Sequence, residues 1–209
     1  MNAVLRSIKP YFLYLILIGR KKIELGKDIP KGDWNKEVYL YCSKDKKSFN
    51  RIPKSERYLV KMYLGKVACK FICDEVIEVY SQAEPPHELE FVATEKMLQR
   101  VIRDADKNGR IYFRFDEYCW LSKEEIRAYL GDKKGYGWSI SELEIFEEPK
   151  ELGEFCFPSE KFCEKGLCGD CPKYEIPSYE YGEVDFDCEW KKPIEKAPQS
   201  WCYVKEISE

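Results

Sequence analysis

The stretch from residue 155 to about residue 196 constrains this chain more than any other feature of its sequence. Prolines and clustered cysteines replace the apolar periodicity of the earlier residues. Alternation of apolar and polar side chains then returns in residues 200–207, which is typical of a β-strand. Because a strand must pair with a sheet, we expect this last segment to complete a domain that starts near the N-terminus. The sequence therefore predicts one domain over residues 1–153, closed by 196–209, with residues 154–195 inserted between them.

The rest of the chain alternates short strand patterns with short helix patterns. An apolar run after Pro10 ends at Gly19 and predicts a buried helix. Ser122 and Glu125 have the spacing of a capping box, which predicts a helix over residues 123–130. We expect strands at 4–8, 21–25, 37–42, 67–80 and 136–146, a further helix at 95–107, and an exposed loop at 43–54. This order favours a mixed α/β (α+β) fold, a small β-barrel flanked by short helices, over a doubly wound sheet.

Charge, histidine content and the N-terminal apolar run exclude several classes of protein. The 35 basic and 38 acidic residues nearly cancel, so a polybasic DNA-binding surface is not expected and contact with nucleic acid should be local. The single histidine, His87, follows two prolines and leaves little material for histidine-dependent hydrolases. The apolar run 11–18 is far shorter than the ~20 residues that cross a bilayer. We therefore expect a cytoplasmic protein without a membrane partner, whose cysteines are reduced thiols or metal ligands.

The residues after the first predicted helix resemble a known family. ASCH domains, a branch of the PUA-like superfamily, typically carry Gly-x-Lys-x-x-Glu-x-Arg at this place, and Gly19, Lys21 and Glu24 match its first three positions. Gly26 stands at the arginine position, with Lys27 beside it as a substitute cation. The segments 7–10, 38–43, 65–67, 137–140 and 197–204 resemble other parts of the same domain. The resemblance implies a PUA-like barrel that binds RNA or a modified nucleotide.

Lys21 and Glu24 also suit such a ligand on chemical grounds. A lysine donates to a phosphate or carbonyl oxygen, a glutamate accepts from an exocyclic amine, and aromatic rings stack on bases. Regular strand alternation would place these two side chains on opposite faces, so a shared site requires a bulge or a strand end. The alternative is that both are solvated strand residues. The candidate ligand-binding residues are Ser7, Lys9, Lys21, Glu24, Lys27, Tyr41 and Trp138.

An enzymatic role is an alternative that the resemblance leaves open. Some proteins of this class look like amidohydrolases that remove acyl groups from modified cytidine with a lysine, a threonine and a glutamate. Lys21 matches the lysine and would be the catalytic residue, but Glu24 stands at the threonine position and cannot be a hydroxyl nucleophile. A binding module is therefore the preferred interpretation. A nucleoside amidohydrolase or ribonuclease, and an adaptor that acts through the cysteine-rich insertion, are the alternatives.

The cysteine cluster predicts a structural zinc site. Cys168 and Cys171 form a C-x-x-C pair with glycine in its turn, and a proline-rich segment with little core of its own gains stability from a metal. An iron–sulfur cluster, a disulfide and unmodified thiols are the alternatives. The predicted zinc ligands are Cys163, Cys168, Cys171 and Cys188, with Cys156 as an alternative ligand. The other five cysteines should be buried small hydrophobes.

Overall fold

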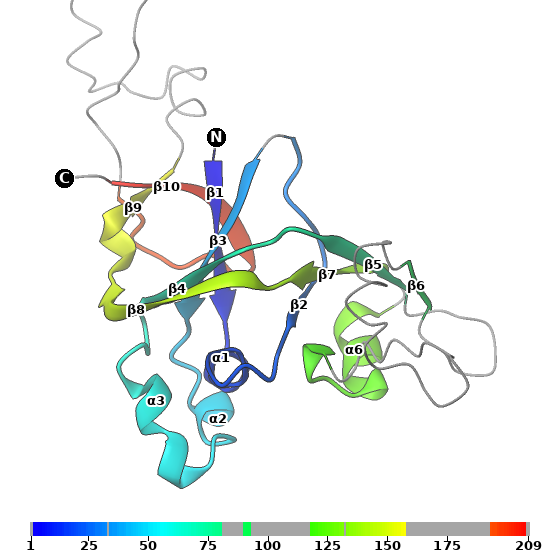
Figure 1. Cartoon of the computed structure of the whole chain (residues 1–209), viewed down its shortest axis with the longest axis horizontal. Helices are drawn as coiled ribbons and strands as arrows, with labels where there is room; N and C mark the ends of the chain where they lie inside the picture. The colour runs from blue at the N-terminus through cyan, green and yellow to red at the C-terminus, as the bar shows by residue number, and fades with distance from the viewer. Residues whose placement is uncertain are drawn as a thin grey trace, which may run out of the picture.

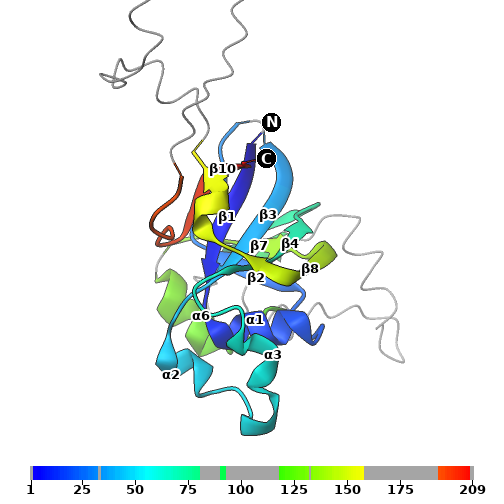
Figure 2. The same cartoon turned by 90° about the vertical axis from the view of Figure 1, so that its left-hand side faces the viewer.

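The computed structural model describes residues 2–32, 34–80, 90–92, 118–131, 133–157 and 193–207. It shows two β-sheets and several short helices, so the prediction of a mixed α/β fold is confirmed (Figures 1 and 2). The helix predicted at 95–107 and the four principal zinc ligands lie outside the described residues.

The larger sheet contains both ends of the described chain. Its order is β8-β4-β3-β1-β10-β9. The strands are β1 (Asn2–Ile8), β3 (Trp34–Cys42), β4 (Val67–Ile72), β8 (Ser141–Lys150), β9 (Phe155–Cys156) and β10 (Trp201–Glu206). Strand β1 pairs in parallel with β3 and antiparallel with β10, so the last strand lies directly beside the first (Figure 1). Pro149 lies inside β8, which tolerates it because β8 is an edge strand.

The second sheet has the order β2-β7-β5-β6, with β2 (Ile23–Gly26), β5 (Val76–Tyr80), β6 (Glu90–Val92) and β7 (Gly135–Ser139). The predicted closed barrel is wrong for the described strands. Each of two predicted long strands, 67–80 and 136–146, bends and divides between the two sheets. Glu75 and Ser139 tie the two bends together, because the Glu75 amide donates to Ser139 Oγ over 2.9 Å. Among the described strands, each sheet ends at two edge strands, β8 and β9 in the larger sheet and β2 and β6 in the smaller one, and these edges do not pair to close a barrel.

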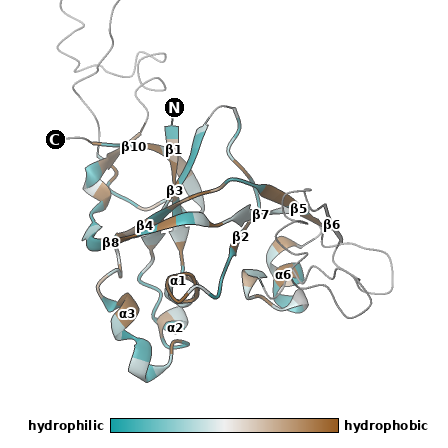
Figure 3. Cartoon of the chain, viewed as in Figure 1, coloured by the Kyte–Doolittle hydropathy of each residue, from teal (hydrophilic) through white to brown (hydrophobic). Residues whose placement is uncertain are grey.

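Two predicted helices are confirmed. Helix α1 (Pro10–Leu17) begins with Pro10 in its first turn and buries most of its side chains. Its ribbon has the brown colour of hydrophobic residues (Figure 3). Helix α6 (Lys123–Leu130) begins at the predicted capping box, in which Glu125 N donates to Ser122 Oγ and Ser122 N donates to the Glu125 carboxylate.

The prediction of an exposed loop at 43–54 is wrong, because part of this segment is helical and part is buried. The segment contains helix α2 (Lys46–Phe49). The Asp45 side chain caps the N-terminus of this helix by accepting a hydrogen bond from the Ser48 amide. Ser48 and Ile52 are buried there, which anchors the segment to the core. A 3₁₀ turn, η1 (Lys54–Glu56), and helix α3 (Tyr58–Lys61) follow. A second 3₁₀ turn, η3 (Leu152–Glu154), precedes β9.

The main core lies where α1 covers the larger sheet, and it continues to Trp138 of β7. Two smaller clusters lie under α6 and beside β9 and β10. Cys42, Cys69, Cys73 and Cys119 are buried, as predicted, and Cys202 is partly buried. Within the described residues, the helices are all too short or too polar to cross a membrane.

Candidate functional site

Segments that lie far apart in the sequence meet around a pocket of about 670 Å³. Its lining comes from the end of β1, the start of α1, the residues before and within β2, helix α6 with Leu121, and the segment 197–200 that leads into β10. Tyr41, Ser43 and Arg51 complete it. Pairing of β1 with β10 brings the last segment into place, since the Ser7 amide donates to Ser200 O over 3.0 Å. The size is that of a small-molecule site.

The end of helix α1 directs Lys21 into the protein. Gly19 adopts a φ of +72°, a left-handed conformation that favours glycine and reverses the chain. The amides of Arg20 and Lys21 then both donate to Leu15 O. Lys21 lies before β2 rather than within it, so the alternation that would separate it from Glu24 does not apply. Lys21 thus lies just outside the start of β2, the arrangement that a site shared with Glu24 requires.

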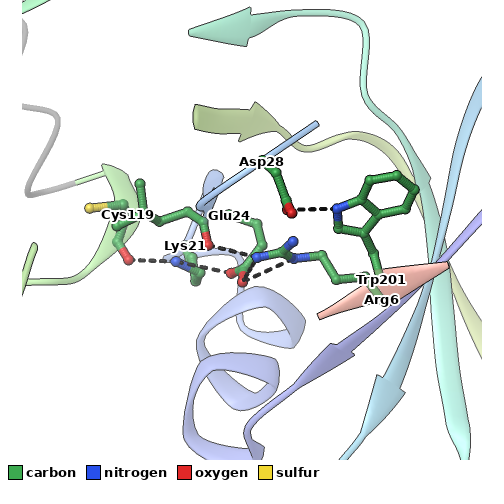
Figure 4. Close-up of polar contacts among 7 residues, drawn as sticks. Arg6, Lys21, Glu24, Asp28, Cys119 and Trp201 are labelled. Atoms are coloured by element: carbon green, nitrogen blue, oxygen red, sulfur yellow. Dashed lines mark hydrogen bonds and ion pairs between the residues drawn. The ribbon is translucent and has the colours of Figure 1, made fainter. Parts of the chain in front are cut away.

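Lys21, Glu24 and Arg6 form a buried cluster of charges (Figure 4). Lys21 Nζ lies 3.3 Å from Glu24 Oε2 and donates to Cys119 O over 2.6 Å. Arg6 Nη2 lies 3.4 Å from Glu24 Oε1 and donates to Leu25 O over 2.7 Å. Lys21 is only 2% exposed and Glu24 8% exposed. They are therefore not solvated strand residues, because a buried charge requires partners of this kind.

Arg6 is the functional candidate that the sequence interpretation missed. Its guanidinium lies 5.0 Å from the centre of the Trp138 ring, and its Nη1 has no hydrogen-bond partner among the described residues. It also lies beside Gly26, the residue at the arginine position of the ASCH pattern. A charged residue within the apolar strand pattern of 4–8 was the only signal in the sequence. Arg6, rather than the expected Lys27, thus supplies the cation beside Glu24.

The structure brings five of the seven predicted ligand-binding residues to this pocket: Ser7, Lys9, Lys21, Glu24 and Tyr41. Ser7 Oγ donates to Pro198 O over 2.6 Å, which fixes one wall. Burial raises the pKa of the Tyr41 hydroxyl, so it stays protonated and able to donate near neutral pH. Their contact with a ligand remains a prediction.

Lys27 and Trp138 do not line the pocket. Lys27 is exposed, and its Nζ lies 4.9 Å from the centre of the Tyr129 ring. Trp138 is fully buried and packs against Arg6 and Trp34. The stacking surface expected from Trp138 is thus covered by protein in this structure. Phe12, Tyr41 and Tyr129 are the aromatic residues that line the pocket instead.

The lining combines apolar walls with an excess of positive charge. Its cations are Arg6, Lys9, Lys21 and Arg51, and its carboxylates are Glu24 and Glu125. Burial is the main cause that raises the pKa of the Tyr129 hydroxyl, with Arg6 acting in the opposite direction. Such a lining suits a ligand that has a flat apolar body and a negative group.

No metal-binding group is found among the described residues. Cys156, the alternative zinc ligand, is buried in β9, where its thiol donates to Lys205 O over 3.5 Å. Its neighbour across a β-bridge is Pro193, so the two ends of the cysteine-rich segment lie side by side. The zinc site therefore stays a prediction about residues outside those described.

Comparisons with known proteins give a distant likeness. No family model and no curated protein match the chain. Among solved structures, the chain is similar to an ASCH protein from Zymomonas mobilis at 12% identity and a TM-score of 0.46, over 97% of this chain and 87% of that one. A serine-to-alanine mutant of that protein gives 12% identity and a TM-score of 0.47, over 98% and 89% of the two chains. These TM-scores are too low to establish a ligand or an activity for this chain.

Proposed function

We propose that this protein binds RNA or a modified nucleotide through the pocket around Lys21, Glu24 and Arg6. The observation that carries the proposal is the buried charge cluster that opens into a pocket with aromatic walls. Burying three charges is costly, and such groups are concentrated at functional sites. The resemblance of the Gly19–Glu24 segment to ASCH domains supports the same class of ligand.

Each part of the cluster has a role that fits a nucleotide. Arg6 Nη1, which is buried and lacks a hydrogen-bond partner among the described residues, would donate to a phosphate or carbonyl oxygen that reaches it from the pocket. The Glu24 carboxylate accepts from Arg6 and forms an ion pair with Lys21, and it retains lone pairs for an exocyclic amine. Phe12, Tyr41 and Tyr129 offer ring surface for a base. The excess of cations in the lining attracts the phosphate.

The same contacts favour binding over hydrolysis. The Lys21 amine contacts the Cys119 carbonyl oxygen and the Glu24 carboxylate, so its contacts among the described residues include no hydroxyl that it could activate as a nucleophile. Ser43 lines the pocket, but its buried Oγ forms no hydrogen bond with a described residue, so none of them is placed to activate it as a general base.

The experiment that tests the proposal is recovery of RNA with the purified protein, followed by sequencing and nucleoside mass spectrometry. Binding of the four nucleoside 5′-monophosphates is measured in parallel by calorimetry. We expect an enriched RNA or nucleoside, a lower yield of it with the Lys21→Ala variant, and an unchanged yield with Lys31→Gln, an exposed site outside the pocket. Failure of the wild-type protein to retain any RNA or nucleotide would contradict the proposal. Conversion of a nucleoside in the sample would favour the hydrolase alternative.

A further inference from the structure

The segment 44–66 is the most basic part of a chain whose formal net charge is −3. It contains eight lysines and arginines but only two acidic residues. The cations that are exposed and form no ion pair with a described carboxylate are Lys44, Lys46, Lys47, Lys54 and Lys61. We call the exposed residues of this segment the α2–α3 surface.

The two acidic residues of the segment offset only part of its positive charge, since eight basic residues stand against them, and each carboxylate bonds a neutral donor rather than one of these lysines. The Asp45 side chain caps helix α2 through the Ser48 amide, over 3.0 Å. The Glu56 carboxylate accepts from the Tyr14 hydroxyl of helix α1. The positive charge of the lysines is therefore left for an external partner.

The α2–α3 surface also carries exposed apolar side chains. Tyr58 is 70% exposed and Met62 50% exposed, and they lie one helical turn apart, beside Lys61. An exposed aromatic ring among lysines is the combination with which proteins hold single-stranded nucleic acid, because bases stack on the ring while the lysines contact phosphates.

This surface is continuous with the pocket. Helices α2 and α3 project together from one end of the molecule, beside α1 (Figures 1 and 2). Ser43, which directly precedes the segment 44–66, and Arg51, which lies within it, both line the pocket. The Arg51 guanidinium lies 4.2 Å from the centre of the Tyr11 ring, and the Tyr11 amide donates to Ser48 Oγ over 3.1 Å. An RNA strand with one nucleotide in the pocket would thus run past Arg51 and reach the lysines of the α2–α3 surface.

We propose that the α2–α3 surface binds the phosphodiester backbone of a single-stranded RNA whose one nucleotide occupies the pocket. This inference rests on the proposed function and adds that the partner is a strand rather than a mononucleotide. An anionic membrane would meet the same lysines. RNA is favoured because the surface adjoins a pocket suited to a nucleotide, and binding to a membrane would not use such a pocket.

The test compares two variants with the same change of charge. One is Lys47→Gln/Lys54→Gln/Lys61→Gln on the α2–α3 surface. Its control is Lys31→Gln/Lys36→Gln/Lys133→Gln, at exposed lysines outside that surface. Fluorescence anisotropy measures binding of a labelled random-sequence RNA of about 12 nucleotides over a range of salt concentrations, and calorimetry measures binding of the four nucleoside 5′-monophosphates. Thermal melting of both variants checks that they are folded.

Each phosphate contact contributes about 0.7 to the salt slope of a single strand, or about fivefold in affinity near 0.1 M salt. We expect the surface variant to bind the RNA about 5- to 30-fold more weakly with a smaller salt slope, and to bind the mononucleotides as the wild type does. Equal RNA affinity of the surface variant and its control overturns the inference and leaves the pocket proposal intact. Weaker mononucleotide binding by Lys21→Ala, or an altered preference among the four mononucleotides in Glu24→Gln, supports the pocket independently of this surface. Binding to phosphatidylserine vesicles in preference to RNA would assign the surface to a membrane and overturn the inference.

Discussion

Arg6 occupies the space that a side chain at Gly26 would need. Arg6 Nη1 lies 3.2 Å from the position of a Cβ atom on residue 26, and Trp138 Nε1 lies 3.0 Å from it. The guanidinium reaches Glu24 and Leu25 O from this place. The absence of a side chain at Gly26 thus leaves room for the guanidinium of an arginine from another strand.

We therefore expect Gly26→Ala to destabilise the protein by about 1–2 kcal/mol, because the new methyl group meets a buried ring and a buried guanidinium. The free energy of unfolding from urea titration measures this. Gly153→Ala is the matched control, since a Cβ there would have no neighbour within 4 Å. Equal stability of both variants would show that the packing around Arg6 yields easily.

Removal of Glu24 should cost more than removal of Lys21. Glu24→Gln leaves two buried cations, Arg6 and Lys21, without their shared carboxylate, and breaking a buried pair in this way costs about 3–5 kcal/mol. Lys21→Met leaves Glu24 paired with Arg6 and loses mainly the hydrogen bond to Cys119 O, about 1–2 kcal/mol. Urea titration of both variants decides the order. Glu144→Gln, in an exposed pair with Lys70, should change stability by less than about 1 kcal/mol, and the reverse order at the buried site would contradict this account.

Lys21 and Glu24 should affect ligand binding differently. Lys21→Ala is expected to weaken binding of RNA or nucleotide by ~1–3 kcal/mol and to lower the salt slope, because a charge-assisted contact to an anion is lost. Glu24→Gln should change the preference among bases with little change in salt slope, since a carboxylate releases no counterion from the nucleic acid. Binding isotherms at several salt concentrations, well below the melting temperature of each variant, test both. Unchanged affinity, base preference and salt slope in two folded variants would exclude this pocket as the binding site.

The cysteine cluster should hold about one zinc ion per chain, because four thiolates provide the coordination that zinc prefers in structural sites. Elemental analysis of protein purified without added metal measures it. Cys168→Ser/Cys171→Ser should lose the metal, while Cys202→Ser, at a thiol in β10, should retain it. A wild-type content below about 0.2 zinc or iron per chain would end the metal hypothesis.

Truncation after Lys150 should abolish cooperative unfolding. The missing β10 pairs with β1 in the interior of the larger sheet, so its loss exposes a strand edge and the apolar side chains around Val204. Differential scanning calorimetry and light scattering measure the melting and the association. The matched control replaces residues 160–190 by a short Gly-Ser linker, which the bridge between Cys156 and Pro193 makes geometrically feasible. Cooperative melting of the truncated monomer would disprove the proposed domain continuity.

Local signals in the sequence were sufficient for the elements that depend on neighbouring residues. Pro10 and Gly19 bound α1, and the Ser122–Glu125 capping box begins α6, because capping contacts act within one turn. The apolar alternation of 200–207 predicted β10. The resemblance of the Gly19–Glu24 segment to ASCH domains suggested Lys21 and Glu24 as candidate site residues, although strand alternation alone placed them on opposite faces.

Tertiary structure decided what depends on contacts between distant segments. Arg6 reaches Glu24 only because β1 passes beside β2, and no local pattern encodes that approach. The bends beside Glu75 and Ser139 divide the segments 67–80 and 136–146 between the two sheets. Apolar periodicity along a single segment cannot reveal such a division. Trp138 is covered by packing against Arg6 and Trp34, so its burial follows from the fold and not from its own segment. Sequence alone thus determined the local elements and pointed to two charged residues, Lys21 and Glu24, whereas packing between segments added Arg6 and determined which side chains share the pocket.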